Sequence, residues 1–433
     1  MSALESDAYR EFRRDLHRHP EPAWREFYTT ARIVEELRKR DLTELHVGRD
    51  ALATDDRMNV PDDDELAEWE QRARDAGADP DIVDGLSGGY TGCVAVAERG
   101  DGPVVALRVD IDALPIRESD EGDHAPAAKG FRSENEGFMH ACGHDAHATM
   151  GLGTLDAVLD SDFAGTLKVF FQPGEEQVAG GKPMAESGHL DDVEYLYAVH
   201  VGLDHPSGEV VCGIDGFLAV RHFLAEFTGE PAHAGARPEQ GRNAVQAMAA
   251  AVQNLYAIPR HADGPTRVNA GLVGGGTATN IVPEESYIEG ELRGGTTELA
   301  AYMSDHADRI LESAAAMHDC EVDVATKGEA PSATSDDALA RIVGDVAGAT
   351  AGVTEIVDSD DLGGSEDATY LMNRVQENGG LACYVGVGTD HPGGHHTSTF
   401  DVVEGDIQVG IDVLSGAILR VAERRPRADA RDR

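Results

Sequence analysis

The segment Met139-His140-Ala141-Cys142-Gly143-His144-Asp145-Ala146-His147 places a cysteine and a histidine two positions apart, with a glycine between them. Gly143 leaves the backbone free to bend, so the Cys142 thiolate and the His144 imidazole can face one metal ion. An apolar run over 150–159 follows and predicts a helix, so the motif should lie on a tight loop at a helix N-terminus. Taken alone, the segment also fits a helix start that happens to be rich in histidine.

Three downstream segments place further ligand-type side chains after predicted strands. The β-branched and aromatic run 166–172 predicts a buried strand, which Pro173-Gly174 ends just before two adjacent glutamates. The run 195–199 ends on a histidine, and a strand over 382–387 precedes Gly393-Gly394-His395-His396. Open α/β sheets bind their ligands at the carboxyl ends of strands, so these segments favour a site over a chance cluster.

The combined donor set contains sulfur, nitrogen and oxygen, which suits divalent transition metals. Glu175 is left uncommitted by this set and can act as a general base. The predicted ligands of two divalent ions are Cys142, His144, Glu176, His200 and His396.

The order of these motifs resembles the metallopeptidase superfamily of aminoacylases and glutamate carboxypeptidases, and the Cys-Gly-His-Asp form is similar to its amidohydrolase branch. The resemblance runs from about Phe12 to Phe400 and includes Arg108-Val-Asp110-Ile-Asp112-Ala-Leu-Pro115 and Gln172-Pro-Gly-Glu-Glu176. It implies a metal-dependent enzyme that cleaves the amide bond of an N-acyl or N-aroyl amino acid. Two divalent ions are implied, with Mn²⁺ favoured and Zn²⁺ possible.

The resemblance also assigns roles to residues outside the ligand set. Asp112 would orient metal-bound groups, although a solvated loop carboxylate is the alternative. His233 would reach into a partner subunit's site and polarise the scissile carbonyl, while Asn280 and Arg293 would hold the substrate carboxylate. Gly274-Gly275-Gly276 lacks a following lysine and helix start, so we interpret it as a loop and not as a phosphate site.

Residues 49–89 form an acidic insert between a predicted helix and a predicted strand. The stretch from Gly48-Arg49-Asp50 to Gly88-Gly89-Tyr90-Thr91-Gly92 is similar to the insert of the p-aminobenzoyl-glutamate hydrolase subfamily. That similarity makes p-aminobenzoyl-glutamate, split to p-aminobenzoate and glutamate, the expected substrate. A surface elaboration without a catalytic role is the alternative for the insert.

The length suggests two domains. We expect an α/β catalytic domain, a mixed sheet flanked by helices, over 1–213 and 330–423, with a polar and disordered tail over 424–433. A hairpin-like segment over 208–213 should lead into an inserted ferredoxin-like βαββαβ domain over 214–329, for dimerisation or as a lid. Its expected elements are strands 221–229, 268–273, 286–293 and 321–326 and helices 243–258 and 298–318.

Two other local patterns carry structural predictions. Cys93 to Ala97 and Val104 to Asp110 should form two strands joined by a glycine-rich turn. His17 and His19 lie at the end of a predicted amphipathic helix and are interpreted as helix-end packing, because the helix dipole favours histidine there.

The charge of the chain is strongly acidic, with 80 Asp and Glu against 36 Lys and Arg and a formal net charge of −44. The acids are spread along the chain, so they do not form one interaction tail, and nucleic acid is excluded as a partner class. Multimolar salt would screen their mutual repulsion, so the composition indicates adaptation to high salt.

The 5 cysteines are widely spaced, and their odd number indicates free thiols in a reducing cytoplasm. The N-terminal segment is charged and does not resemble a signal peptide, and no apolar run reaches the roughly 18 residues that a membrane span needs. We therefore expect a soluble, cytoplasmic protein that acts on a small molecule, without nucleic-acid or membrane partners.

Three functions remain in competition at this point. The first is hydrolysis of p-aminobenzoyl-glutamate, and the second is general N-acyl amino acid hydrolysis of the hippurate or auxin-conjugate type. The third is an inactive metal-binding subunit that serves as a structural partner in a heteromer. Glu175 and the complete ligand set argue against the third. The expected assembly is a homodimer or a heteromer with a homologous subunit.

Overall fold

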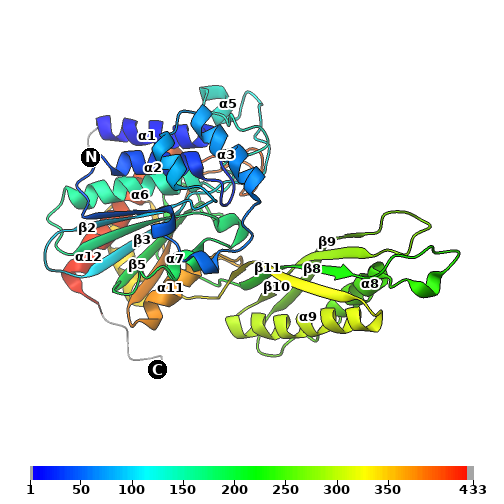
Figure 1. Cartoon of the computed structure of the whole chain (residues 1–433). Helices are drawn as coiled ribbons and strands as arrows, with labels where there is room; N and C mark the ends of the chain where they lie inside the picture. The colour runs from blue at the N-terminus through cyan, green and yellow to red at the C-terminus, as the bar shows by residue number, and fades with distance from the viewer. Residues whose placement is uncertain (1–2, 427–433) are drawn as a thin grey trace. The chain divides into compact units, whose positions relative to one another are not determined.

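The computed structural model describes residues 3–426, which divide into two compact units (Figure 1). Unit 1 holds the residues up to 216, 333–362 and those from 367 on, and unit 2 holds 217–332 and 363–366. Unit 2 thus begins three residues later than the sequence predicted, and it takes in the short segment 363–366. Of the expected tail, residues 427–433 lie outside the described range.

Unit 1 is built on an eight-stranded mixed sheet with the order β1-β2-β4-β3-β5-β14-β6-β12. Its centre is parallel, because β3 pairs with β4 and β5, and β14 pairs with β5. The carboxyl ends of these central strands therefore meet at one edge of the sheet. The strands of unit 1 are β1 (Glu44–Val47), β2 (Cys93–Glu98), β3 (Val104–Asp110), β4 (Thr166–Gln172), β5 (Tyr195–Val201), β6 (Glu209–Val211), β12 (Glu355–Val357) and β14 (Leu381–Val387), with a separate pair β7 (Ile214–Asp215) and β13 (Asp360–Asp361).

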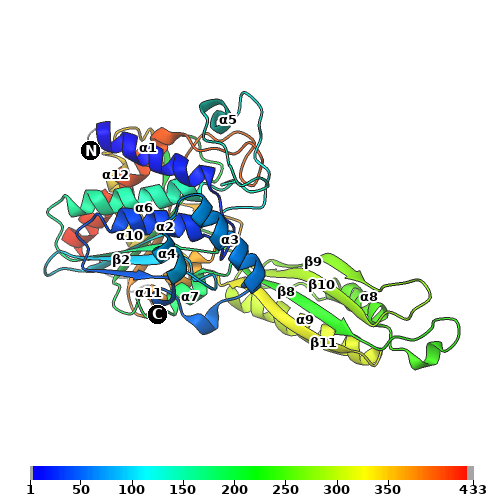
Figure 2. The ribbon, with the colours of Figure 1, turned by 45° about the horizontal axis from the view of Figure 1, so that its top comes forward.

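Helices cover both faces of this sheet, with α1, α2 and α6 on one side and α7 and α11 on the other (Figures 1 and 2). Fully buried strands of this kind need apolar cover on both faces. The helices of unit 1 are α1 (Ala3–Arg18), α2 (Phe27–Leu37), α3 (Asp63–Asp75), α4 (Pro80–Gly85), α5 (Ala125–Lys129), α6 (His144–Leu159), α7 (Gly181–Ala185), α10 (Asp337–Ala347), α11 (Ala368–Glu377) and α12 (Glu404–Arg424), with 3₁₀ turns η1 (Gly48–Asp50), η2 (Thr54–Asp56) and η3 (Glu175–Gln177).

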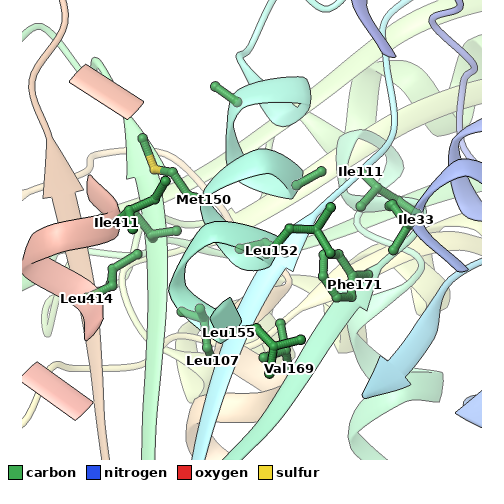
Figure 3. Packing of buried hydrophobic residues seen from close by; sticks show 14 of the residues in the cluster. Ile33, Leu107, Ile111, Met150, Leu152, Leu155, Val169, Phe171, Ile411 and Leu414 are labelled. Atoms are coloured by element: carbon green, nitrogen blue, oxygen red, sulfur yellow. The ribbon is translucent and has the colours of Figure 1, made fainter. Parts of the chain in front are cut away.

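Helix α6 is the central element of the main hydrophobic core (Figure 3). Leu152 and Leu155 of α6 are buried in the same cluster as Phe171 of β4 and Ile411 of α12. A Cβ atom on Gly153 would come within 2.3 Å of the Ile411 side chain, so α6 and α12 approach as closely as a glycine allows. This packing holds α6 in place, and the Cys-Gly-His motif ends in the first turn of this helix.

The insert over 49–89 contains η1, η2, α3 and α4. Asp62 caps α3 by accepting a hydrogen bond from the Glu65 backbone at 2.8 Å. Leu66 and Trp69 of α3 and Val83 of α4 are buried in the main core. The insert is therefore an integral layer of unit 1.

Unit 2 follows the order βαββαβ, and its sheet has the antiparallel order β11-β8-β10-β9, which is the ferredoxin-like arrangement. Helices α8 and α9 pack on one face around buried Ile288, Met303 and Leu311. Its elements are β8 (Ala219–Thr228), η4 (Pro238–Gln240), α8 (Ala244–Leu255), β9 (Thr266–Gly275), β10 (Glu285–Gly294), α9 (Thr297–Met317) and β11 (Glu321–Ala330).

Strands β2 and β3 form as predicted and are joined by the turn over 99–103, and β4 lies between them in the sheet. The prediction of a hairpin-like segment over 208–213 is wrong, since β6 pairs with β14 and β12 while the next strand, β7, pairs with β13. A short turn is visible in the sequence there, but the partner strands come from distant segments. No helix in the described range is long and apolar enough to cross a membrane.

Candidate metal centre

The backbone at Gly143 sets the geometry of the cysteine-histidine motif. Gly143 has a left-handed conformation, with φ of 91°, and α6 starts at the next residue. A Cβ atom there would lie 2.5 Å from the Val201 side chain, so both the backbone angle and the space require glycine. Cys142 and His144 thereby leave the turn on the same side as the end of β5.

The structure brings the five predicted ligands together as two triads that share one residue. Cys142, His144 and His200 form one triad, and Cys142, Glu176 and His396 form the other. In each triad the potential ligand atoms lie within 4.8 Å of one another. A shared thiolate between two donor sets fits two neighbouring cations, and the mixed donors suit transition metals.

His144 presents a free ring nitrogen to this cluster. Its Nδ1 lies 3.2 Å from Asp112 Oδ1, whereas its Nε2 has no hydrogen-bond partner among residues 3–426. The nearest carboxylate oxygens to Nε2 belong to Asp110, at 3.7 Å, and Glu176, at 3.8 Å. Burial lowers the pKa of His144, but the surrounding carboxylates, Asp110 foremost, raise it to about 10. Negative potential is thus concentrated where a cation would bind.

His200 is oriented by a hydrogen bond on its other side. Nδ1 donates to the carbonyl oxygen of Val201 at 2.7 Å, which directs the Nε2 lone pair toward Cys142 Sγ, 3.3 Å away. Burial and the neighbouring imidazole of His147 hold the pKa of His200 well below its ordinary value. A neutral imidazole and a thiolate facing each other at this distance are the arrangement expected around a common metal ion.

The two glutamates follow β4 on the turn η3. Gly174, with φ of 68°, reverses the chain before Glu175. Asp112 Oδ2 accepts a hydrogen bond from the Glu176 backbone at 3.0 Å, and Glu176 Oε2 lies 3.4 Å from His396 Nε2. Asp112 thus contacts both His144 and the glutamate turn. Glu175 Oε2 lies 4.0 Å from His144 Nε2, and Glu175 forms a further triad of potential ligands with His144 and Glu176, outside the two triads that share Cys142.

His396 reaches the cluster from the loop before α12. It has a left-handed backbone conformation, with φ of 58°, which is uncommon outside glycine. Its backbone N–H donates to the carbonyl oxygen of Ala141 at 2.9 Å, which ties this loop to the motif. Burial lowers the pKa of His396, which favours the neutral ring that binds metals.

His147 and Asp110 belong to the same cluster in position, but their atoms are committed to the protein. The backbone N–H of Val201 donates to His147 Nε2 at 2.9 Å, so Nδ1 carries the proton and donates to Asp110 Oδ1 at 2.5 Å. Asp110 also receives Arg108 at 2.6 Å. Burial would raise the pKa of Asp110, but His144 and Arg108 hold it well below its usual range. The sequence predicted no role for His147 or Asp110, although both lie within the motifs quoted above.

His17 also has more contacts than helix-end packing. Its ring is fully buried between Asp145, at 2.8 Å, and Glu118, at 2.9 Å. Burial and nearby Arg13 lower the pKa of His17, but the two carboxylate contacts raise it, to about 9. His17 therefore connects α1 to the residue that follows His144. His19 remains at the helix end, where its Nδ1 bonds to the Asp15 carbonyl oxygen.

The three predicted residues of unit 2 are exposed or half-buried, and they are not all brought together. His233 and Asn280 are neighbours, because the Ala234 backbone donates to the Asn280 carbonyl oxygen at 2.9 Å. Arg293 is paired with Val220 at the opposite end of β10, where its guanidinium contacts Glu291 and Ser365 Oγ. Within one chain, Arg293 and Asn280 cannot hold the same carboxylate group.

Known proteins match this chain along most of its length. The sequence profile of peptidase family M20/M25/M40 matches residues 106–420. This chain belongs to that family. An indole-3-acetyl-aspartic acid hydrolase of Enterobacter agglomerans is 40% identical over 409 residues, 94% of each chain. A p-aminobenzoyl-glutamate hydrolase chain from Escherichia coli K12, one subunit of that enzyme, is 39% identical over 412 residues, again 94% of each chain. The chain is thus an M20 amidohydrolase.

Solved structures of other proteins show the same fold. An aminobenzoyl-glutamate utilization protein from Klebsiella pneumoniae aligns with a TM-score of 0.83 and 33% identity, over 97% of this chain and 98% of that one. A Bacillus subtilis protein described as a dinuclear metal-binding peptidase of the M20 family aligns with a TM-score of 0.66 and 24% identity, over 98% and 99% of the two chains. Family membership and the two donor triads together support a centre for two divalent ions.

Proposed function

We propose that this M20 chain hydrolyses the amide bond between an aromatic acyl group and an acidic amino acid, with p-aminobenzoyl-glutamate as the first substrate to test. The observation that carries the proposal is the pair of donor triads sharing Cys142, with Glu175 beside them and outside the predicted ligand set. The two relatives named above support the substrate class, because by name each acts on an aromatic acyl group joined to aspartate or glutamate.

In the proposed mechanism the bound ions and the protein groups have different roles. Two divalent ions held by Cys142, His144, Glu176, His200 and His396 would acidify a water molecule and polarise the scissile carbonyl. The family resemblance favours Mn²⁺, which imidazole and carboxylate ligands accept, whereas the Cys142 thiolate favours Zn²⁺ and leaves that ion possible.

Glu175 takes the proton of the attacking water and returns it to the nitrogen of the leaving amino acid. Its position supports this role, since Glu175 Oε2 lies 4.0 Å from His144 Nε2, next to the predicted ligands but outside the two triads that share Cys142. Asp112 fixes both sides of the centre, because one oxygen faces His144 Nδ1 and the other accepts the Glu176 N–H.

His233 is suited to stabilise the oxyanion that develops on the substrate. Its Nδ1 accepts hydrogen bonds from the backbones of Gly235 and Ala236, each at 3.1 Å. The neutral ring therefore carries its proton on Nε2, where an exposed N–H is available to an oxygen of a substrate.

A partner subunit would explain how the residues of unit 2 take part in catalysis. Arg293 stands eight positions beyond Glu285 in β10, and His233 and Asn280 lie past the Glu285 end, so roughly 26 Å of strand separates them. A small substrate cannot span that length, so we infer that His233 and Asn280 serve the site of a second subunit. Edge strand β9 supports such pairing, since Leu272 and Val273 on it are 60% and 50% exposed.

A side-by-side assay tests the substrate class. Manganese-loaded protein should release glutamate from p-aminobenzoyl-glutamate with a kcat/KM at least about tenfold above that for hippurate, a difference of about 1.4 kcal/mol in transition-state binding. The Glu175→Gln variant, assayed in the same way, is the control for background release of glutamate. Preference for hippurate would favour a general N-acyl amino acid hydrolase. No hydrolysis of any acylated amino acid, with metal bound and a homologous subunit supplied, would favour a structural subunit.

A further inference from the structure

Glu26 is a buried carboxylate close to the metal centre, and neither the ligand set nor the proposed chemistry uses it. It is fully buried just before α2, and no lysine or arginine in the described range lies within ion-pair distance of it. Its Oε2 accepts a hydrogen bond from Thr91 Oγ1 at 2.6 Å, and its Oε1 accepts one from the backbone N–H of Gly174 at 2.8 Å. Burying such a group without a countercharge is costly, so its contacts need an explanation.

The Gly174 contact lies at the base of the turn that carries Glu175. Gly174 is the left-handed residue that reverses the chain after β4, and Glu175 follows it directly. On the other side of Glu175, the backbone N–H of Glu176 donates to Asp112. Two buried carboxylates therefore hold the turn on either side of Glu175: Glu26 binds the Pro173–Gly174 peptide, one residue before it, and Asp112 binds the Glu175–Glu176 peptide directly after it.

The rest of the turn is packed tightly enough to transmit this constraint. A Cβ atom on Gly180 would come within 1.6 Å of the Pro173 carbonyl oxygen, so the returning chain lies directly against the start of the turn. The Ala179 backbone also donates to the Gly174 carbonyl oxygen at 3.1 Å. Gly174 is thus held at its carbonyl oxygen by Ala179 and at its N–H by Glu26.

We propose that Glu26 is a positioning residue that sets the placement of Glu175 by holding the Gly174 N–H. This proposal rests on the proposed role of Glu175 as general base. The proposed role depends on the length of the Glu26 side chain and not on its charge, because both groups that donate hydrogen bonds to it are neutral. Burial raises the pKa of Glu26 to about 8, which agrees with a site that does not depend on a permanent negative charge.

Glu21 provides a matched control in the same loop. It is 1% exposed, burial raises its pKa to about 8 as well, and its two oxygens also accept neutral N–H groups. Those donors are the backbones of Tyr28 and Thr29 in the first turn of α2, each at 2.8 Å. Changes at Glu21 should therefore affect the stability of α2 without moving the turn that carries Glu175.

Two substitutions at Glu26 separate the effect of side-chain length from the effect of charge. Glu26→Gln keeps the length and an acceptor oxygen but removes the charge, whereas Glu26→Asp keeps the charge but is shorter by one methylene. We expect Glu26→Asp to lower kcat by about ten- to a hundredfold with KM changed by less than about twofold, because a small misplacement of a reacting group has effects of this size. Glu26→Gln should stay within about threefold of wild type, and Glu21→Asp should also keep its kcat.

Metal content, thermal unfolding and crystal structures of the metal-loaded variants complete the test without relying on turnover. Each variant should bind as much manganese as wild type, and only Glu26→Asp should show the Glu175 carboxylate displaced. A kcat near wild type and an unmoved Glu175 in Glu26→Asp would overturn the proposal, as would an equal loss in Glu26→Gln, which would indicate a role for charge. If wild type itself hydrolyses no acylated amino acid, the proposed function fails, while the position of Glu175 in the crystal structures still decides the role of Glu26.

Discussion

The two units present their functional side chains in opposite ways. In unit 1, Cys142, His144 and His200 are at most 8% exposed, and hydrogen bonds orient both imidazole rings. In unit 2, His233 and Asn280 are exposed on loops, where His233 Nδ1 accepts only local backbone N–H groups. The buried set brings three potential metal ligands within 4.8 Å of one another without any group from unit 2. The exposed pair belongs to none of the triads found in the described range, and we propose that it serves the site of a second subunit.

The largest effect that follows from this comparison is at Glu175. Glu175→Gln should lower kcat by about 10²- to 10⁴-fold, because the general base is lost. Metal content should stay near wild type, measured by atomic emission on dialysed protein. Glu176→Gln is the control and should lose metal together with activity. The reverse pattern would show that the roles of the two glutamates are exchanged.

A smaller loss is expected at the exposed histidine. His233→Ala should lower kcat by about 10²-fold, the effect typical of removing one hydrogen-bond donor to an oxyanion, with metal content and melting temperature unchanged. Steady-state kinetics and metal analysis on the same sample measure both. Unchanged kcat would remove His233 from catalysis and leave unit 2 with a purely structural role.

Salt should act on the exposed carboxylates far more than on the buried centre. Because the net charge is −44 and the screening length is only about 3 Å at 1 M salt, the melting temperature should fall by about 10 °C or more between about 3 M and 0.1 M potassium chloride. Differential scanning calorimetry of the metal-loaded protein measures this shift. A melting temperature independent of salt would contradict adaptation to high salt.

The smallest effect concerns the buried pairing of His17. The pKa of His17 is about 9 in the folded protein, above the value of about 6.5 expected when unfolded. Its contribution to stability, at most about 3 kcal/mol, is therefore full below pH 6.5 and is lost as pH rises through 9. The stability difference between wild type and His17→Gln, from urea unfolding at fixed salt, should shrink over this window. A constant difference would show that His17 has the same pKa in both states.

The sequence could indicate which residues the structure gathers into the two triads, because local patterns encode their positions. Gly143 allows a bend between Cys142 and His144, and strand ends set the places of Glu176 and His200. That these residues bind metal stays a prediction. The ferredoxin-like order of unit 2 could likewise be predicted from alternating strands and helices.

The predictions that failed or were missing depend on long-range contacts. The insertion of β4 between β2 and β3 is a matter of topology, which no turn between adjacent strands reveals. The partners of His17 are 101 and 128 positions away, and Glu26 contacts a residue 148 positions away. None of these pairings leaves a periodic signal in the sequence. The sequence therefore did not indicate the contacts of His17 and Glu26, whereas it did indicate the predicted metal ligands.

Complementation between variant chains tests most directly whether two chains share one site. His233→Ala and Glu175→Gln protein, each inactive or nearly so, should be mixed under conditions in which labelled subunits are shown to exchange. A mixed dimer then contains one site with Glu175 from one chain and His233 from the other, so activity should rise to about a quarter of wild type for two equal pools, because half of the dimers are mixed and each has one intact site. No recovery in a mixture that exchanges would contradict the account and place His233 in the site of its own chain or outside catalysis.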